Sequence, residues 1–300
     1  MDIINQIKEL KEKKNALIVA HNYQIDQIQE IADFVGDSFY LSKVCNERKE
    51  DIIVFCGVYF MAESAKILSP DKKVLIPDKN AGCPLANMIT GEDIDKIREK
   101  YPNHTIVAYI NTSAEVKAKS DVICTSSNAI KIVEKIPNDK IVFLPDKNLG
   151  NFVKKHVPQK EIIIWEGYCI THYKISKEDV EKARNAHPDA KILVHPECRP
   201  EVVELADFVG STKQIIDYAT NSEYEEFIIG TEMGIMYSLK KLNPNKKFYI
   251  LHPGMVCPNM KKNTLPALKD ALMYEQFEVK LDNNIIENAQ KALKLMLELS

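Results

Sequence analysis

The sequence lacks the features that would direct a chain to a membrane, to secretion or to nucleic acid. No apolar stretch approaches the roughly 20 residues that a helix needs to cross a bilayer. Residues 1–14 alternate like an amphipathic helix and contain no apolar segment of the signal-peptide kind. There is no basic run or Arg-rich tail, and the formal net charge is −3. We therefore expect a cytoplasmic protein that binds neither a membrane nor nucleic acid.

Two further absences concern domain organisation and cysteine chemistry. No low-complexity linker interrupts the 300 residues, and 45% hydrophobic with 28% charged residues is typical of a globular chain, so we predict one compact body. The seven cysteines include no closely spaced CxxC pair, which is common in structural zinc sites. An odd number of cysteines in a cytoplasmic chain favours metal ligation or reactive thiols over disulfides.

What the sequence does contain is a threefold internal repeat. The segment ADFVGDS at 32–38 returns as ADFVGST at 206–212, and SDVICTS at 120–126 is a weaker middle copy, at offsets of 88 and 86 residues. Self-similarity at a fixed period indicates one structural unit that has been copied. Three copies predict a pseudo-threefold arrangement in which equivalent positions converge near one axis.

Each copy alternates helices with short apolar strands, which is typical of parallel sheets covered on both faces. We therefore predict an α/β protein of three homologous three-layer α/β/α units, residues 1–83, 84–169 and 170–257. A C-terminal extension, 258–300, should form a helix, a short strand at 277–281 and a second helix, and brace the last unit. The predicted strands are 16–20, 52–57 and 73–77, then 105–109, 140–145 and 161–165, then 191–195, 226–231 and 247–251.

Local signals refine this pattern. Helices are predicted over 27–34 and 199–208, after the first strands of units one and three. Thr90 and Ser176 each precede a helical segment with Asp three residues later, which approximates a capping box. The tetrapeptide PDKN occurs at 77–80 and again at 145–148. Because its 68-residue separation differs from the repeat offsets of 88 and 86, we interpret both copies as turns, in which Asp and Asn are favoured.

Three cysteines follow the period of the repeat and share a loop position after the third strand of each unit: Cys83, Cys169 and Cys257. We predict that they are metal ligands that meet at the axis. Three distant thiolates suit three irons of a 4Fe–4S cluster whose fourth iron stays open, and an open metal position permits Lewis-acid chemistry. His172 is then a fourth ligand or a pocket acid, with a surface position as the alternative. Four cysteines in or beside apolar elements are expected in the core: Cys45, Cys56, Cys124 and Cys198.

Polar residues end the first strand of every unit. The carboxyl ends of parallel strands are where open α/β sheets bind ligands, so we predict that these residues and their neighbours line a pocket. Glu197 is the natural general base in that pocket, although a turn-shaping role is the alternative. The three sets are His21–Asn22–Tyr23, Tyr109–Ile110–Asn111 and His195–Pro196–Glu197.

Hydroxyl residues lie where a turn enters a helix in each unit. Helix N-capping is their simplest role, and it is compatible with binding a carboxylate or a phosphate at the same place. Three such termini that converge would hold a multiply anionic substrate. The residues are Ser38, Ser126, Ser211 and Thr212.

Taken together, a series of motifs in this order resembles the quinolinate synthase family over nearly the whole chain. The motifs are HNYQ at 21–24, ADFVGDS, MAESAKIL at 61–68, CPLAN at 83–87, YIN at 109–111, CTSSNA at 124–129, VHPEC at 194–198, VGST at 209–212 and KKNTL at 261–265.

The resemblance implies three α/β/α units around a pseudo-threefold axis, with one 4Fe–4S cluster on Cys83, Cys169 and Cys257. It also implies a transferase that condenses iminoaspartate with dihydroxyacetone phosphate to quinolinate in de novo NAD biosynthesis. An aspartate-oxidising enzyme that supplies iminoaspartate is a candidate partner. The implied catalytic residues are Tyr23, His172 and Glu197, and the implied substrate-binding residues are His21, Ser38, Tyr109, Asn111, Ser126, His195, Glu197 and Thr212.

Two departures from the family pattern are visible. Ile170 follows the middle cysteine where Pro is common, and Met260 stands where some members have the second Cys of a C-terminal CxxC pair. Three other readings stay open. One is an aconitase-like hydro-lyase whose substrate lacks a phosphate. Another is an iron–sulfur sensor or electron carrier, which needs no buried acid–base groups. The last is an α/β scaffold that holds zinc.

Overall fold

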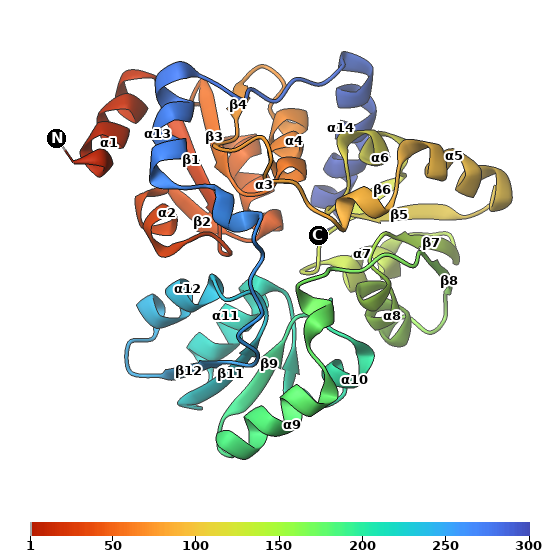
Figure 1. The fold of residues 1–300 in the computed structure, drawn as a ribbon. Coiled ribbons are helices and arrows are strands. Elements are labelled where there is room, and N and C mark those ends of the chain that lie inside the picture. Colours follow the sequence, from red (N-terminus) through yellow and green to blue (C-terminus); the bar gives the residue numbers. More distant parts are fainter. Residues whose placement is uncertain (1) are drawn as a thin grey trace.

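In the computed structural model, which describes residues 2–300, three four-stranded parallel sheets follow one another along the chain (Figure 1). Each sheet has the same spatial order, second–first–third–fourth strand, so the predicted α/β class with three similar units is confirmed. The strands are β1 (Ala16–His21), β2 (Phe34–Gly36), β3 (Ile52–Cys56) and β4 (Lys73–Leu75), then β5 (Thr105–Tyr109), β6 (Val122–Cys124), β7 (Lys140–Leu144) and β8 (Glu161–Ile164), then β9 (Lys191–Val194), β10 (Phe208–Val209), β11 (Glu226–Gly230) and β12 (Lys247–Ile250).

The repeated segment ADFVG forms an edge strand that the sequence did not predict. The predicted helices 27–34 and 199–208 were wrong at their ends, because α2 stops at Ile31 (Asp26–Ile31) and α10 spans only Pro200–Val203. The aspartate of the repeat explains the change. The Asp33 carboxylate accepts a hydrogen bond from the backbone N–H of Ile18 at 2.9 Å. Asp121 and Asp207 make the same contact with the first strand of their units, which fixes the following residues as β6 and β10.

Helices cover the faces of these sheets and begin where the sequence signals predicted. Thr90 and Ser176 both form complete capping boxes with the aspartates three residues later. Among residues 2–300, no helix combines the length and the apolar character that crossing a membrane would require. The helices of the three units are α1 (Ile3–Lys13), α3 (Ser38–Glu47), α4 (Tyr59–Leu68), α5 (Gly91–Lys100), α6 (Ala114–Lys119), α7 (Ala129–Lys135), α8 (Lys147–His156), α9 (Lys177–Ala186), α11 (Thr212–Asn221) and α12 (Ile235–Leu242).

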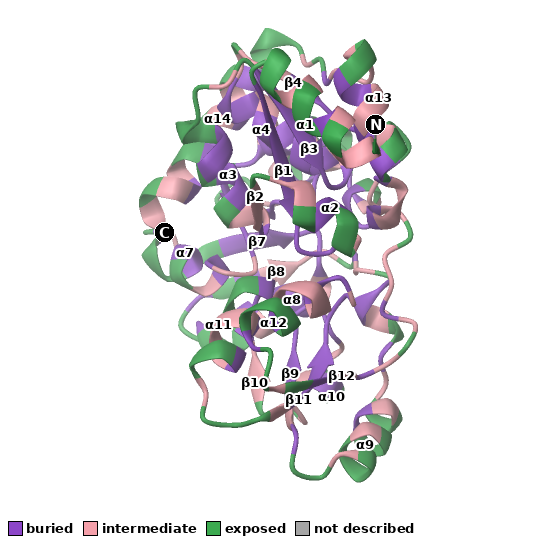
Figure 2. Ribbon diagram, turned by 90° about the vertical axis from the view of Figure 1, so that its left-hand side faces the viewer, coloured by how far each residue is buried: buried purple, intermediate pink, exposed green. Residues whose placement is uncertain are grey.

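The hydrophobic core is not shared equally among the units. Figure 2 shows the buried strands at the centre of the molecule. One large cluster joins the first two units through side chains such as Val19 and Phe143. The third unit instead has two clusters of its own, which include Ile192 in one and Phe227 in the other.

The C-terminal extension braces the first two units, and the predicted brace on the last unit was wrong. Helix α13 (Leu265–Tyr274) packs against α1 and β3, while α14 (Asn283–Leu299) packs against α4, α6, α7 and β6. The predicted strand at 277–281 is reduced to a single antiparallel bridge between Glu278 and Leu75. Because α14 buries Leu293 and Met296 in the shared core, it covers the seam between units one and two.

Leu293→Ala should therefore destabilise the protein. The Leu293 side chain is fully buried in that core, and removing a buried leucine costs about 2–5 kcal/mol because a cavity is left behind. Denaturant unfolding of the iron-free protein would measure the loss. Lys294→Ala, at the exposed neighbouring position, is the control, and equal midpoints for the two variants would contradict this role of α14.

Candidate active site

A cavity of about 650 Å³, partly open to solvent, lies at the junction of the three units. The strand order explains its position, because connections leave the first and third strands of each sheet in opposite directions and open a crevice at their carboxyl ends. The predicted residues that line it are His21, Tyr23, Ser38, Cys83, Tyr109, Asn111, Ser126, Cys169, His172, His195, Glu197, Thr212 and Cys257.

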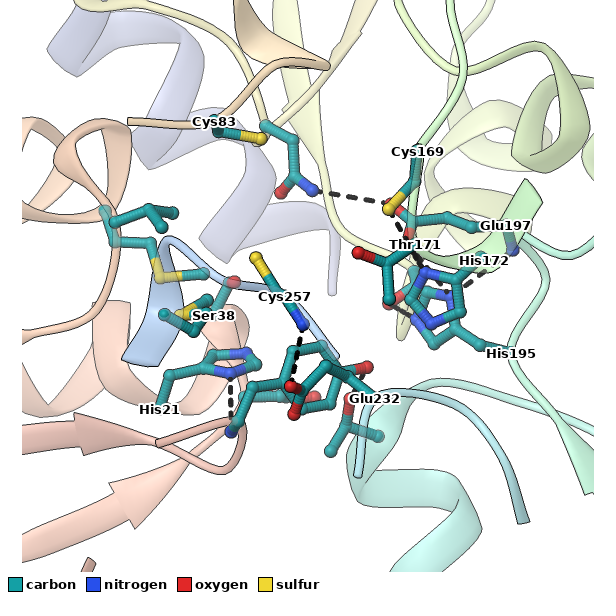
Figure 3. A pocket seen from close by; sticks show the side chains of 18 of the residues that line it. His21, Ser38, Cys83, Cys169, Thr171, His172, His195, Glu197, Glu232 and Cys257 are labelled. Carbon is teal, nitrogen blue, oxygen red and sulfur yellow. Dashed lines mark hydrogen bonds and ion pairs between the residues drawn. The ribbon is translucent and has the colours of Figure 1, made fainter. Parts of the chain in front are cut away.

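Each unit contributes one cysteine to this cavity. In Figure 3 the sulfurs of Cys83, Cys169 and Cys257 point into a common space. A short 3₁₀ turn begins three residues after each cysteine, η1 (Ala86–Met88), η2 (His172–Lys174) and η3 (Met260–Lys262), so the three ligand loops are built alike. The other four cysteines are buried away from the cavity lining, as predicted.

The spacing of the three sulfurs fits a polynuclear group better than a single ion. Around one tetrahedral zinc, thiolate sulfurs lie about 3.8 Å apart, given Zn–S bonds of about 2.3 Å. Within residues 2–300, the compact set of three ligand atoms within 4.8 Å of one another is Cys169, His172 and Glu197, and not the three cysteines. Three thiols that line one cavity without all lying that close together are compatible with iron–sulfur ligation.

The protonation of these thiols depends on a bound cation. Burial raises the pKa of Cys83 to about 12 and raises the pKa of Cys169 well above its ordinary value. The pKa of Cys257 is raised for the same reason. Without a metal the three groups are neutral thiols, and metal binding releases their protons.

His21 and His195 are held in the same way by their own units. The ring Nδ1 of His21 accepts a hydrogen bond from the backbone N–H of Tyr23 at 3.1 Å, and Nδ1 of His195 accepts one from Glu197 at 3.3 Å. Burial lowers the pKa of both imidazoles to about 3. Both are therefore neutral, and the backbone N–H contacts favour the tautomer with the proton on Nε2, which can donate to an oxygen. His195 Nδ1 also lies 3.4 Å from Glu197 Oε2, and its Nε2 lies 3.2 Å from the Ser126 hydroxyl.

A continuous chain of hydrogen bonds joins the three predicted catalytic residues. Glu197 Oε2 lies 2.8 Å from His172 Nδ1. His172 Nε2 lies 2.8 Å from the Thr231 hydroxyl, which is 2.6 Å from the Tyr23 hydroxyl. Thr212 in turn donates to Tyr23 at 2.8 Å. Four of the five side chains belong to the third unit and Tyr23 belongs to the first; all but the buried Thr231 line the cavity.

The two ends of this chain have opposite protonation. Burial opposes ionisation of Glu197, but the charge and hydrogen bond of His172, with a hydrogen bond from Tyr109, lower the pKa of Glu197 to about 2. Burial raises the pKa of Tyr23 well above its ordinary value. At neutral pH one end of the chain is therefore a carboxylate that can accept a proton, and the other end is a phenol that can donate one.

The hydroxyl residues divide into caps and cavity groups. Asp37, rather than Ser38, caps α3, and Ser211, rather than Thr212, caps α11. The Ser38 and Thr212 side chains line the cavity, and the Ser126 hydroxyl lies 3.2 Å from His195 Nε2. Ser211, predicted as substrate-binding, lies outside the cavity lining, as do the buried Ile110 and Pro196.

Sequence reasoning missed several residues of the site. Thr231 and Glu232 follow β11, the third unit's equivalent of the strand that precedes the second PDKN. We applied the strand-end argument to first strands only, so the ends of β7 and β11 were overlooked. The cavity is also lined by Asp37, Val58, Phe60, Met61, Thr125, Thr171 and Met260.

The fold and the site define a three-unit α/β protein with a cysteine-lined cavity at the junction of the units. A family model described as "Quinolinate synthetase A protein" matches residues 5–298. The chain belongs to this family of enzymes, as its motifs predicted.

Relatives named quinolinate synthase match along nearly their full length. The protein from Caldicellulosiruptor saccharolyticus is 74% identical over 298 residues, which cover 99% of this chain and 98% of that protein. The protein from Alkaliphilus metalliredigens is 55% identical over 99% of this chain and 98% of its own. The protein from Aquifex aeolicus is 50% identical over 100% of this chain and 94% of its own.

Proposed function

We propose that the protein is a transferase that condenses iminoaspartate with dihydroxyacetone phosphate to quinolinate, with loss of phosphate and water, in de novo NAD biosynthesis. The observation that carries the proposal is the meeting of three thiols, one from each unit, with the hydrogen-bonded chain from Glu197 to Tyr23 in one cavity. Membership of the quinolinate synthetase A family supports it. A cytoplasmic location and an aspartate-oxidising partner enzyme remain predictions.

The proposed cofactor is one 4Fe–4S cluster on Cys83, Cys169 and Cys257. When bound, it supplies a Lewis acid at the iron without a cysteine ligand, which can hold a substrate oxygen or nitrogen. His172 was a candidate fourth ligand. Its Nδ1 lies 2.8 Å from Glu197 Oε2 and 3.2 Å from Cys169 Sγ, and its Nε2 lies 2.8 Å from the Thr231 hydroxyl. The contacts with Glu197 and Thr231 support an acid–base role.

Binding of the substrates is assigned to neutral donors. Iminoaspartate carries two carboxylates and dihydroxyacetone phosphate carries a phosphate, so the site must bind several negative charges. The Nε2–H groups of His21 and His195 face the cavity, as do the hydroxyl of Ser38 and the side chain of Thr212, whose hydroxyl here donates to Tyr23 at 2.8 Å and can turn to an anionic substrate. Ser38 and Thr212 stand at the first turn of α3 and α11, where the helix dipole favours an anion.

Proton transfer is assigned to the hydrogen-bonded chain. Formation of the ring requires removal of protons from carbon and protonation of the oxygen that leaves as water. Glu197 takes a proton as the base, and Tyr23 gives one as the acid. His172 and Thr231 lie between them within hydrogen-bond reach of both, so a proton can pass along the chain without entering solvent.

Anaerobic purification followed by an assay with both substrates tests this proposal. We expect about four irons per chain, on the 4Fe–4S reading, and quinolinate formation that needs iminoaspartate and dihydroxyacetone phosphate together. A cluster-loaded protein that makes no quinolinate would contradict the proposal. Turnover of a phosphate-free hydroxy acid would favour the hydro-lyase, and a reversible redox couple without turnover would favour the electron carrier.

Ser126→Ala and Thr212→Val should weaken substrate binding. A hydrogen bond to a charged group contributes about 1.5–3 kcal/mol, so each variant should raise the KM of an anionic substrate by roughly tenfold or more. Iron content should not change. Ser211→Ala is the contrasting variant, because loss of an N-cap costs about 1 kcal/mol of stability and leaves the cavity intact. Unchanged KM values in the first two variants would refute these roles.

A further inference from the structure

The two copies of PDKN lie in different environments. In the first copy, Asp78 Oδ1 accepts a hydrogen bond from the backbone N–H of Asn80 at 2.7 Å, within an exposed turn. The second copy follows β7 and opens α8 at the edge of the cavity. The interpretation of both as turn chemistry was therefore incomplete for residues 145–148.

Asp146 uses both of its carboxylate oxygens. Oδ1 caps α8 by accepting from the backbone N–H of Leu149 at 2.8 Å, and Oδ2 accepts from the backbone N–H of Cys169 at 3.0 Å. The side chain is fully buried. The two loops also touch directly, because Lys147 N–H donates to the Gly167 carbonyl at 2.8 Å. A Cβ on Gly167 would lie 2.5 Å from the carbonyl oxygen of residue 145, which leaves no room for a side chain.

Asn148 extends the contact to the loop of the proposed base. Its Nδ2 donates to the backbone carbonyl of Glu197 at 2.9 Å, and the side chain is buried. The first turn of α8 therefore contacts the backbone of Cys169 on one side and the backbone of Glu197 on the other. These residues belong to loops of two different units. The first PDKN copy also contacts a distant segment, because Lys262 Nζ donates to the Asn80 carbonyl at 2.7 Å, but the Asp78 carboxylate accepts from Asn80 within its own turn.

The internal repeat shows that a carboxylate at this position recurs. The equivalent residues after β3, β7 and β11 are Val58, Asp146 and Glu232. The next residue in every unit donates its N–H to the cysteine loop, at 2.7, 2.8 and 2.8 Å. Glu232 Oε1 accepts from the backbone N–H of Cys257 at 2.9 Å. Two units therefore hold their cysteine through a buried carboxylate, and the unit of Cys83 has an apolar residue there.

We propose that Asp146 and Asn148 are positioning residues that fix Cys169 and Glu197 relative to each other. The assignment rests on the proposed function for the roles of Cys169 as a ligand and Glu197 as the base. Asp146 holds the ligand loop, Asn148 holds the loop of the base, and the rigid first turn of α8 joins the two. Asp146 and Asn148 do not touch the reacting atoms.

Asp146→Asn tests the ligand half of the proposal, that Asp146 holds the loop of Cys169. Asparagine caps a helix as well as aspartate does, so α8 should form, but an amide has one acceptor oxygen and cannot also accept from Cys169. In iron-free protein, we expect the backbone amides of 167–171 to exchange hydrogen at least several-fold faster than in wild type. Iron-loaded protein should also lose iron faster to a chelator. Asp78→Asn, the same change in the same tetrapeptide, should leave both measurements unchanged.

Asn148→Ala tests the base half. Displacement of a catalytic group by about 1 Å can cost on the order of 100-fold in rate, so kcat should fall by roughly 10- to 100-fold while KM and iron content are retained. Asn80→Ala is its matched control in the first PDKN copy.

The two parts of this proposal, Asp146 holding the Cys169 loop and Asn148 holding the Glu197 loop, can each be refuted without refuting the proposed function. Equal amide exchange in Asp146→Asn and Asp78→Asn would overturn the ligand half, and this measurement needs neither iron nor substrate. If Asp146→Asn does not fold, Asp146→Ser replaces it, because serine caps the helix and is too short to reach Cys169. Wild-type turnover in Asn148→Ala would overturn the base half. Absence of quinolinate formation in the wild-type protein would overturn the proposed function and leave the exchange result decisive for Asp146.

Discussion

Alanine at Cys83, Cys169 or Cys257 should abolish both iron binding and quinolinate formation. Each unit supplies one thiol to the cavity, and no other cysteine among residues 2–300 lines it. A variant with two of the three ligands would leave an additional iron without a protein ligand. Iron and sulfide analysis after anaerobic reconstitution, together with the visible absorption of the cluster, measures the loss.

Cys45→Ala and Cys56→Ala are the matched controls. Both thiols are fully buried in hydrophobic clusters, and burial raises the pKa of Cys45 to about 12, so it stays a neutral core side chain. These variants should retain iron and turnover, with at most a modest loss of stability from the small cavity. Intact iron in Cys83→Ala would overturn the ligand assignment.

Glu197→Gln should lower turnover by about 10²- to 10⁴-fold, the usual contribution of a positioned general base. Glutamine keeps the size of the side chain, and its carbonyl can still accept from His172, which lies 2.8 Å away. The iron content and the KM values should therefore survive. Rapid-quench measurement of a single turnover would place the loss in the chemical steps.

Tyr23→Phe should also slow turnover, because it interrupts the chain at the Thr231 hydroxyl, 2.6 Å from the Tyr23 hydroxyl. The double variant should lose less than the product of the two single effects if the residues act as one unit. Wild-type turnover in Glu197→Gln would show that the base lies elsewhere, and His172 would be the next candidate.

Much of the architecture could be predicted because the internal repeat is visible as short, similar sequence segments at a fixed period. The period of the cysteines and of the strand ends placed Cys83, Cys169 and Cys257 with His21 and His195 around one cavity, and the structure brings them together. Capping at Thr90 and Ser176 was equally local, because each signal lies within one turn of the helix that it starts.

What could not be predicted depends on contacts between distant segments. Thr231 reaches Tyr23 across 208 residues, and nothing beside it in the sequence indicates that contact. The edge strand β2 exists because Asp33 bonds to Ile18, a contact that competes with helix continuation only once β1 is in place. The contact of Asp146 with Cys169 could not be predicted either. Residues 145–148 have the same sequence as residues 77–80, which form an ordinary exposed turn.

The repeat also has a consequence for recognition of an asymmetric molecule. A ring of three identical subunits would present the same side chain at all three corners of its central cavity, and its ligand could then bind in three equivalent orientations. Here the corners carry different chemistry, with His21, Tyr109 and His195 at the ends of the first strands. Joining the units in one chain frees each corner to diverge. A pseudo-threefold scaffold can thereby bind an asymmetric substrate in one orientation only.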